Sequence, residues 1–429
     1  MSSVARRVRP VCLRLSTNAA VAAPLALYGI ALLVRMLAIV PARFPMNEGS
    51  AYYVAVAQNL AAGRGLVIDA IWSYATPPLD LPRPAFELWQ PMASFVAAIP
   101  MTLFGSSLLS AQLAFALLGA LVAPLAWLAA RDAASLLGLD ESRAASVTLG
   151  SGLLAALLGP FLVATAAPDS TTPFTIFGTL ACLLMPRALA RGGWWSLALG
   201  ITLGLAFLAR MEAVYLGLTF LLLMALAGRR VGGRRGGYLR LLGPVIAGGA
   251  VVSLPWLVRN SLTFEGGFGS QALENVFFTR NEDVFAYLQR PDLETFLAQG
   301  AGTIAANIGV ALWHGLFDVV LLWAAPVGIV GLATGIVLLR RGELRTSGLG
   351  ALLISGLLTY LITSLVLPVA TRWGTFQHAA GPLLVGLTVA AVLGTDRLLA
   401  ELRRRRRWPR SNAWLGPLAL AAMTVPLST

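Results

Sequence analysis

Glu48 has the sequence context that most clearly suggests chemistry. It lies in the polar segment 41–50, directly after residues 23–40, an apolar stretch long enough to form most of a membrane span. Residues 51–63 then have the pattern of a short helix that lies along the membrane interface. A carboxylate at this boundary is placed to react with a molecule held in the bilayer.

Further polar residues occur beside other apolar stretches. Ionisable groups inside or next to a membrane span are costly, so they indicate function by default. A carboxylate can remove a proton from a hydroxyl group, and the planar guanidinium of arginine can hold a phosphate through two parallel hydrogen bonds. The main candidates that the sequence predicts at one membrane face are Glu48, Asp169, Arg210, Arg259 and Arg372. Possible supporting residues are Asn47, Glu87, Glu212, Asn260 and His378.

Each of these residues also has a purely structural interpretation. Arg210 and Glu212 can pair with each other, and Asp169 can cap the helix that follows it. His378 fits a packed interface residue better than a catalytic base. Glu48 is harder to explain in this way, because the alternative is an unpaired carboxylate beside hydrocarbon.

The elements that must position these residues are membrane helices. The chain is 57% hydrophobic and 12% charged, and apolar runs of about 18 to 25 residues recur from end to end, as in polytopic α-helical membrane proteins. We predict an all-α polytopic membrane protein, a single transmembrane domain over residues 1–429 with about 11 spans. The predicted spans are residues 23–41, 107–130, 144–165, 171–187, 193–209, 211–228, 240–258, 316–339, 348–367, 379–396 and 412–428.

The distribution of positive charge predicts the orientation. All 32 basic residues are arginine, and most fall between spans on one side if the N-terminus is cytoplasmic, as the positive-inside rule requires. We therefore expect a multi-pass protein of the plasma (inner) membrane, with the polar group on the extracytoplasmic face. Arg403–Arg407 fit an anchor at anionic membrane lipids. The net charge of +13 does not indicate nucleic-acid binding, because no basic soluble module accompanies it.

Two sizeable loops lie on the extracytoplasmic side in this arrangement, residues 42–106 and 259–315. The first contains residues 92–104, which are apolar but short and include a proline, so we predict a second interfacial helix there. The spacing of the two cysteines and two histidines does not suggest a metal site. We expect no cofactor, and a divalent cation between carboxylates and a phosphate stays an open alternative.

The order of the motifs resembles the GT-C glycosyltransferases of the protein O-mannosyltransferase and aminoarabinose transferase type. A first span leads to the acidic Asn47-Glu48 pair and a proline-rich loop, and an aspartate, Asp169, follows the third span. The turn Ala209–Glu212 and the segment Pro255–Asn260 complete the pattern. The resemblance covers the first 260 residues, which implies a GT-C-like module over 1–260 and additional C-terminal spans over 261–429.

The resemblance implies an inverting sugar transfer from a polyprenyl-phosphate donor to an acceptor hydroxyl. In such a reaction Glu48 would be the base and Asp169 a supporting carboxylate. Arg210, Arg259 and Arg372 would bind the departing lipid phosphate, and Arg372 is assigned by position alone. A sugar carried on a lipid phosphate needs no nucleotide site, and we find no nucleotide-binding motif.

One position departs from the resembled family, which usually has aspartate where this chain has Asn47. Activity would then rely on Glu48. This departure favours a third interpretation, a non-catalytic membrane scaffold. The other alternative is a transporter or flippase for a lipid-linked sugar, which would place polar groups at mid-membrane depth. The sequence identifies neither the sugar nor the acceptor, which can be a protein, a lipid or a glycan.

Overall fold

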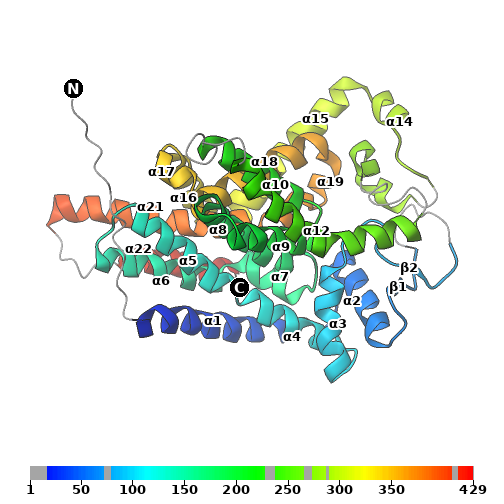
Figure 1. The fold of residues 1–429 in the computed structure, drawn as a ribbon, viewed down its shortest axis with the longest axis horizontal. Coiled ribbons are helices and arrows are strands. Elements are labelled where there is room, and N and C mark those ends of the chain that lie inside the picture. Colours follow the sequence, from blue (N-terminus) through cyan, green and yellow to red (C-terminus); the bar gives the residue numbers. More distant parts are fainter. Residues whose placement is uncertain are drawn as a thin grey trace.

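The computed structural model describes residues 17–71, 79–227, 237–264, 273–286, 289–407 and 414–428, and most of them are helical (Figure 1). Helices satisfy their own backbone polar groups, which hydrocarbon cannot do. The α-helices are α1 (Thr17–Ile39), α2 (Glu48–Ala61), α3 (Met92–Phe104), α4 (Leu108–Gly119), α5 (Val122–Leu136), α6 (Glu141–Leu157), α7 (Gly159–Ala166), α8 (Thr171–Arg191), α9 (Trp194–Ala209), α10 (Ala213–Ala227), α12 (Gly237–Thr263), α14 (Leu293–Ala298), α15 (Gly300–Trp313), α16 (Val327–Leu339), α17 (Gly342–Arg345), α18 (Gly348–Val366), α19 (Pro368–Arg372), α20 (Thr375–Ala379), α21 (Gly381–Arg406) and α22 (Leu415–Ser428). The other elements are strands β1 (Val67–Ile68) and β2 (Arg83–Pro84), the 3-10 turns η1 (Asn275–Phe277) and η2 (Asn281–Phe285), and the π-helical segment η3 (His314–Trp323).

The long apolar helices make this chain an integral membrane protein, as predicted. Within the described residues, 7 helices are long and apolar enough to cross a membrane, or 8 if the bent pair α6–α7 counts as one span. The predicted number of about 11 is not confirmed. The difference lies partly in α9 and α10, which have 16 and 15 residues. A helix of that length rises about 24 Å, less than the roughly 30 Å hydrocarbon core.

The structure also differs from the predicted loop 259–315. One continuous helical segment, α15 with η3, runs from Gly300 to Trp323 and is among the candidate spans. The predicted span 316–339 is interrupted after Trp323, and α16 begins only after Pro326. Proline has no N–H and cannot continue the hydrogen-bond ladder of a helix, which accounts for the interruption.

The pair α6–α7 is bent by 44°. In a continuous helix the carbonyl of Ala156 would accept a hydrogen bond from residue 160, but Pro160 has no N–H to donate. Arg35 of α1 supplies a donor instead, with its Nη1 3.3 Å from this carbonyl oxygen. The guanidinium is therefore fully buried between α1 and the bend. The bend sets the direction of α7 and so of the connection to α8.

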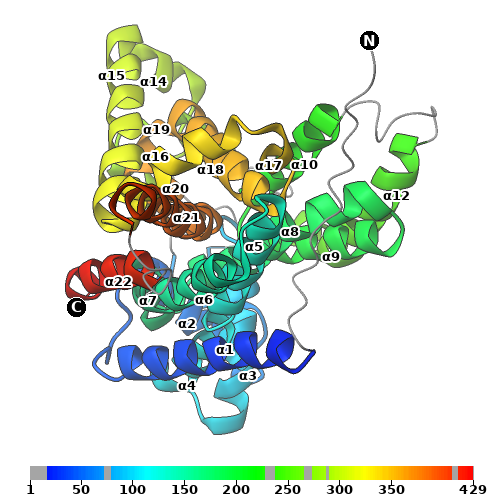
Figure 2. The ribbon, with the colours of Figure 1, turned by 90° about the vertical axis from the view of Figure 1, so that its left-hand side faces the viewer.

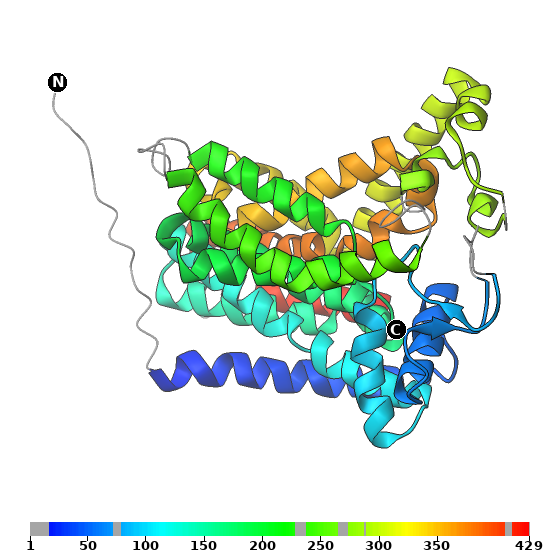
Figure 3. The same cartoon turned by 45° about the vertical axis from the view of Figure 1, so that its right-hand side comes forward.

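The long helices lie side by side, and the chain segments that connect them gather at the two ends (Figure 3). One buried core draws on residues from Met92 to Leu420 and so crosses the predicted module boundary at residue 260. Elements α2, α3, β1 and β2 cover one end of the bundle, here called the loop end (Figures 1 and 3). Helices α14 and α15 project from the bundle in both Figure 1 and Figure 2.

A second core fixes the loop end to the bundle. Strands β1 and β2 pair antiparallel, with Val67 opposite Pro84 and Ile68 opposite Arg83. Buried side chains of α2 and α3 pack with the segment after β2, with α4 and with α12. The helices predicted at residues 51–63 and 92–104 correspond to α2 and α3. The packing of this second core holds α2 against the ends of the membrane-spanning helices.

Candidate active site

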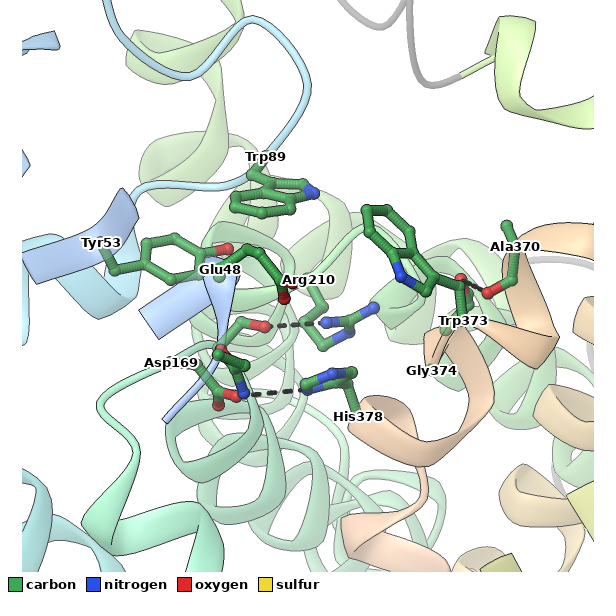
Figure 4. Close-up of a pocket in the computed structure, with 13 residues that line it drawn as sticks. Glu48, Tyr53, Trp89, Asp169, Arg210, Ala370, Trp373, Gly374 and His378 are labelled. Carbon is green, nitrogen blue, oxygen red and sulfur yellow. Dashed lines mark hydrogen bonds and ion pairs between the residues drawn. The ribbon is translucent and has the colours of Figure 1, made fainter. Parts of the chain in front are cut away.

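A cleft of about 170 Å³ opens at the loop end (Figure 4). Five segments form it: the beginning of α2, the segment before α3, the α7–α8 connection, the α9–α10 turn, and α19 with α20. Its lining residues are Asn47, Glu48, Gly49, Tyr53, Trp89, Asp169, Ser170, Arg210, Ala370, Trp373, Gly374, Thr375 and His378. The cleft thus brings together Glu48, Asp169 and Arg210, with Asn47 and His378, from distant parts of the sequence.

Glu48 is the first residue of α2 and reaches the cleft from the helix N-terminus. Asn47 caps this helix, since its side-chain oxygen accepts a hydrogen bond from the backbone N–H of Ser50 at 2.7 Å. The ring of Tyr53 stacks on Trp89, with centroids 5.5 Å apart, and fixes the rotation of the helix. Glu48 is exposed and points into the cleft (Figure 4).

Asp169 lies in the connection between α7 and α8 and is 4% exposed. Its carboxylate accepts a hydrogen bond from the backbone N–H of Thr171 at 2.7 Å, and His378 Nδ1 is 3.3 Å away. The same Nδ1 is 2.7 Å from Thr171 Oγ1. Burial alone would raise the pKa of Asp169, but attraction to the His378 ring and these hydrogen bonds lower it overall. The group is therefore kept as a carboxylate.

Arg210 lies between α9 and α10 with an extended backbone conformation, and its side chain is 16% exposed. Its Nη1 donates to Ser170 Oγ at 2.8 Å, and its Nη2 donates to Glu212 at 2.6 Å. Each terminal nitrogen carries a second N–H, so the guanidinium retains donors for a ligand. Burial lowers the pKa of Arg210, and the Glu212 carboxylate more than offsets this, so the positive charge is held. Glu48 and this guanidinium both line the cleft (Figure 4).

The remaining predicted residues lie outside the cleft lining. Arg259 donates to the carbonyl of Ala85 and to the side chain of Asn260, both at 2.8 Å. Asn260 in turn donates to the carbonyl of Phe86 at 3.1 Å. Both residues therefore hold the segment after β2 on the end of α12. Glu87 pairs with Arg83 at 2.6 Å within the same segment.

Arg372 ends α19 and is exposed. The next residue, Trp373, lines the cleft, whereas Arg372 does not. Trp89, Trp373 and Ser170 line the cleft although sequence reasoning did not select them. No sequence pattern distinguishes these three residues, because isolated aromatic and hydroxyl residues in loops have no characteristic spacing.

A second, larger groove adjoins the cleft. It has a volume of about 330 Å³, and Arg210 and Trp89 line both spaces. Its other walls are mostly apolar and come from α10, the end of α18, and residues 273–276. Val214 and Val366, at the rim, are exposed on the surface of the bundle. The groove thus adjoins the polar cleft at Arg210 and Trp89 and carries exposed apolar residues on its other walls.

Two carboxylates and a histidine, residue types that can bind metal ions, line the cleft. In the parts of the chain that the structure describes, no group of three or more His, Cys, Asp or Glu side chains is arranged to hold a metal ion.

Comparisons with known proteins agree with this architecture. Residues 83–256 match the family described as dolichyl-phosphate-mannose-protein mannosyltransferase. A search of curated proteins found no match. The archaeal oligosaccharyltransferase AglB from Archaeoglobus fulgidus, solved with an inhibitory peptide and a dolichol-phosphate, has 16% identity and a TM-score of 0.59. ArnT from Cupriavidus metallidurans, solved with undecaprenyl phosphate, has 18% identity and a TM-score of 0.50.

These similarities define the class of fold. The match to AglB covers 94% of this chain and 55% of that chain, and the match to ArnT covers 94% of this chain and 71% of that chain. The chain therefore has the fold of the GT-C glycosyltransferases, and the predicted resemblance is confirmed. Within that class, its central segment resembles the protein mannosyltransferases. It spans about half the length of AglB.

Proposed function

We propose that this protein is a membrane glycosyltransferase that moves a sugar from a polyprenyl-phosphate donor to an acceptor hydroxyl, with inversion. The observation that carries the proposal is the position of Arg210 on the wall shared by the polar cleft and the apolar groove. The polyprenyl chain lies in the groove, its phosphate binds Arg210, and the sugar enters the cleft beside Glu48 and Asp169. Guanidinium groups suit phosphate because their hydrogen bonds are charge-assisted and paired.

The reaction exchanges one bond at the anomeric carbon. The acceptor oxygen bonds to this carbon from the face opposite the phosphate, and the bond to the phosphate oxygen breaks. Polyprenyl phosphate leaves with the bonding electrons, and Arg210 stabilises the negative charge that grows on it. Glu48 takes the proton of the acceptor hydroxyl. Glu48 suits this role because it is exposed in the cleft, whereas Asp169 is bound to Thr171 and His378.

The other candidate residues take supporting roles in this proposal. Asp169, with His378, supplies fixed negative charge on the floor of the cleft. Arg259 and Asn260 hold the segment after β2, and Glu212 orients Arg210. Arg372, on the exposed side of α19, is a candidate for attracting the donor phosphate from a distance.

The site faces the extracytoplasmic side in this proposal, in the plasma (inner) membrane. The last turn of α21 carries Arg403–Arg406, and Figure 1 shows this end of α21 far from the loop end. Arginine clusters beside spans are retained in the cytoplasm by the positive-inside rule. The loop end is therefore extracytoplasmic, and the N-terminus is cytoplasmic. The N-terminal arginines that contribute to this prediction lie outside the described residues.

The test is release of polyprenyl phosphate from a panel of radiolabelled polyprenyl-phosphate sugars by the purified protein in lipid. Glu48→Gln should lower turnover by about 10²- to 10⁴-fold, the usual contribution of a general base, while donor binding persists. Glu141→Gln is the matched control, because Glu141 is also an exposed first residue of a helix, α6, but lies outside the cleft. Folded protein that neither binds nor turns over any donor would refute the proposal. Turnover that is insensitive to Glu48→Gln would assign the base to another residue.

A further inference from the structure

Two indole rings flank the mouth of the cleft. Trp89 precedes α3 and Trp373 lies between α19 and α20, so they reach the cleft from opposite halves of the chain. In Figure 4 the two rings stand side by side, with Glu48 and Arg210 below them in the view. Trp373 is 36% exposed although it lines a cleft, and Trp89 is half-buried. An indole in this position offers an apolar face to whatever occupies the polar cleft.

The indole of Trp373 is held by a dedicated support. Phe285, the last residue of η2, packs edge to face against it with centroids 5.3 Å apart. The carboxylate of Asp283 fixes η2, since it accepts hydrogen bonds from the backbone N–H groups of Thr279 and Arg280 at 2.7 and 3.1 Å. Val284, between these residues, belongs to a small buried cluster with α19. These contacts restrict the position of the indole.

The indole of Trp89 is held equally firmly. Tyr53 stacks on it, and Tyr52 packs edge to face at 5.2 Å. Trp89 also lines the apolar groove, whereas Trp373 lines only the cleft of these two spaces. The two rings therefore face different portions of a ligand that occupies both.

From this geometry we propose that Trp89 and Trp373 form a sugar-binding subsite, in which the ring of a pyranose lies against the indole of Trp373. This inference rests on the proposed function, which places the lipid-linked sugar in the cleft. A pyranose presents C–H groups on its faces and hydroxyls at its edge. The C–H groups suit the electron-rich indole face, and the hydroxyls reach the polar groups of Asn47, Ser170 and Thr375 in the lining.

The two tryptophans have separable roles in this subsite. Trp373 contacts only the sugar and not the lipid, so it determines which sugar is accepted. Trp89 stands at the junction of cleft and groove, so it contacts the sugar and the first part of the lipid. Phe285 is a positioning residue that acts through Trp373.

The experiment compares two ligands that differ only in the sugar: radiolabelled undecaprenyl phosphate and the same lipid carrying a neutral pyranose. Binding of each to the purified protein in lipid is measured for Trp373→Ala, Trp373→Phe and Phe285→Ala. Trp194→Ala is the control, because Trp194 is an exposed indole at the start of α9, outside both spaces. Size-exclusion chromatography in detergent identifies variants that remain folded.

Trp373→Ala should weaken binding of the sugar-bearing lipid by about 3- to 12-fold, the range expected for an aromatic contact. Binding of undecaprenyl phosphate should stay unchanged. Trp373→Phe should recover part of the loss, and Phe285→Ala should reproduce part of it. For transfer, the change should appear in KM more than in kcat, and less with a furanose donor.

The outcomes separate this inference from the proposed function. Equal weakening of both ligands, or no weakening of either, would overturn the sugar subsite even if transfer is observed. A sugar-dependent loss of binding without any transfer would support the subsite and count against the catalytic proposal. Wild-type protein that binds neither ligand would overturn both. If Trp373→Ala does not fold, Trp373→Phe and Phe285→Ala carry the comparison.

Discussion

Arg210 provides the sharpest test of how the cleft works. Three arginines are candidates for binding the phosphate, and of these three only Arg210 lines the cleft. Replacing it with methionine would remove the donors that face the leaving phosphate. Removing one such donor from an oxyanion site costs about 2.7 to 4 kcal/mol, or 10²- to 10³-fold in kcat. We expect Arg210→Met to lower kcat by this factor.

The same substitution has a structural effect that must be separated. Glu212 is 8% exposed and accepts a hydrogen bond from Arg210, so Arg210→Met leaves a buried carboxylate without this partner. The double variant Arg210→Met/Glu212→Gln removes that charge. Arg210→Lys keeps the positive charge but loses the paired donors, so its kcat should fall by about 10- to 10²-fold, equivalent to one charge-assisted hydrogen bond.

The assay is single-turnover release of polyprenyl phosphate in lipid, with thermal unfolding of each variant measured in detergent. Arg372→Met is the matched control, because an exposed charge contributes at most about 1 kcal/mol, or roughly fivefold. The reasoning is refuted if the double variant recovers wild-type kcat. It is also refuted if Arg372→Met costs as much as Arg210→Met.

Three further predictions follow from the surrounding contacts. Asn47→Asp should leave the melting temperature nearly unchanged, because aspartate caps a helix as well as asparagine, whereas Asn47→Ala should destabilise by about 1 kcal/mol in thermal unfolding. The lowered pKa of Asp169 contributes stability that is fully present above the unfolded pKa, about 3.9, and is lost as pH falls through the lower folded value. The difference in melting temperature between wild type and Asp169→Asn should therefore be largest above this unfolded pKa and shrink as the pH is lowered below it. Arg259→Ala should increase protease cleavage in the segment after β2 by removing its contact with the Ala85 carbonyl, and an unchanged cleavage pattern would contradict this role.

Sequence reasoning located the catalytic candidates because of where they lie relative to the spans. Glu48, Asp169 and Arg210 each fall beside an apolar stretch, and the alternation of loops puts them on one side of the membrane. Residues at the same end of a helical bundle lie near one another in space, and these three all line the cleft. Position beside an apolar stretch also selected Arg259. It could not show that the Arg259 guanidinium donates to the backbone carbonyl of Ala85, in the segment after β2.

The sequence could not supply the aromatic part of the site or the helix boundaries near residue 300. Trp89 and Trp373 are two of 11 tryptophans, and nothing in their local sequence distinguishes them from those that face lipid. Helix α15 has only 14 residues, too few to cross a membrane alone. Its continuation into η3 is recognisable only when residues 300–323 are considered together.

The contact between Arg35 and the carbonyl of Ala156 couples positions 35 and 160, so that a substitution at one changes the effect of a substitution at the other. Arg35 supplies the donor that Pro160 lacks at the Ala156 carbonyl, and this contact, with a second one to the carbonyl of Ala31, compensates part of the cost of burying its charge. In a Pro160→Ala background the backbone N–H of residue 160 could bond to the Ala156 carbonyl. The buried charge of Arg35 would then destabilise the protein. Substitutions at the two positions should therefore be strongly epistatic, each harmful alone and better tolerated together. Homologous chains are then expected to keep or lose the arginine and the proline as a pair.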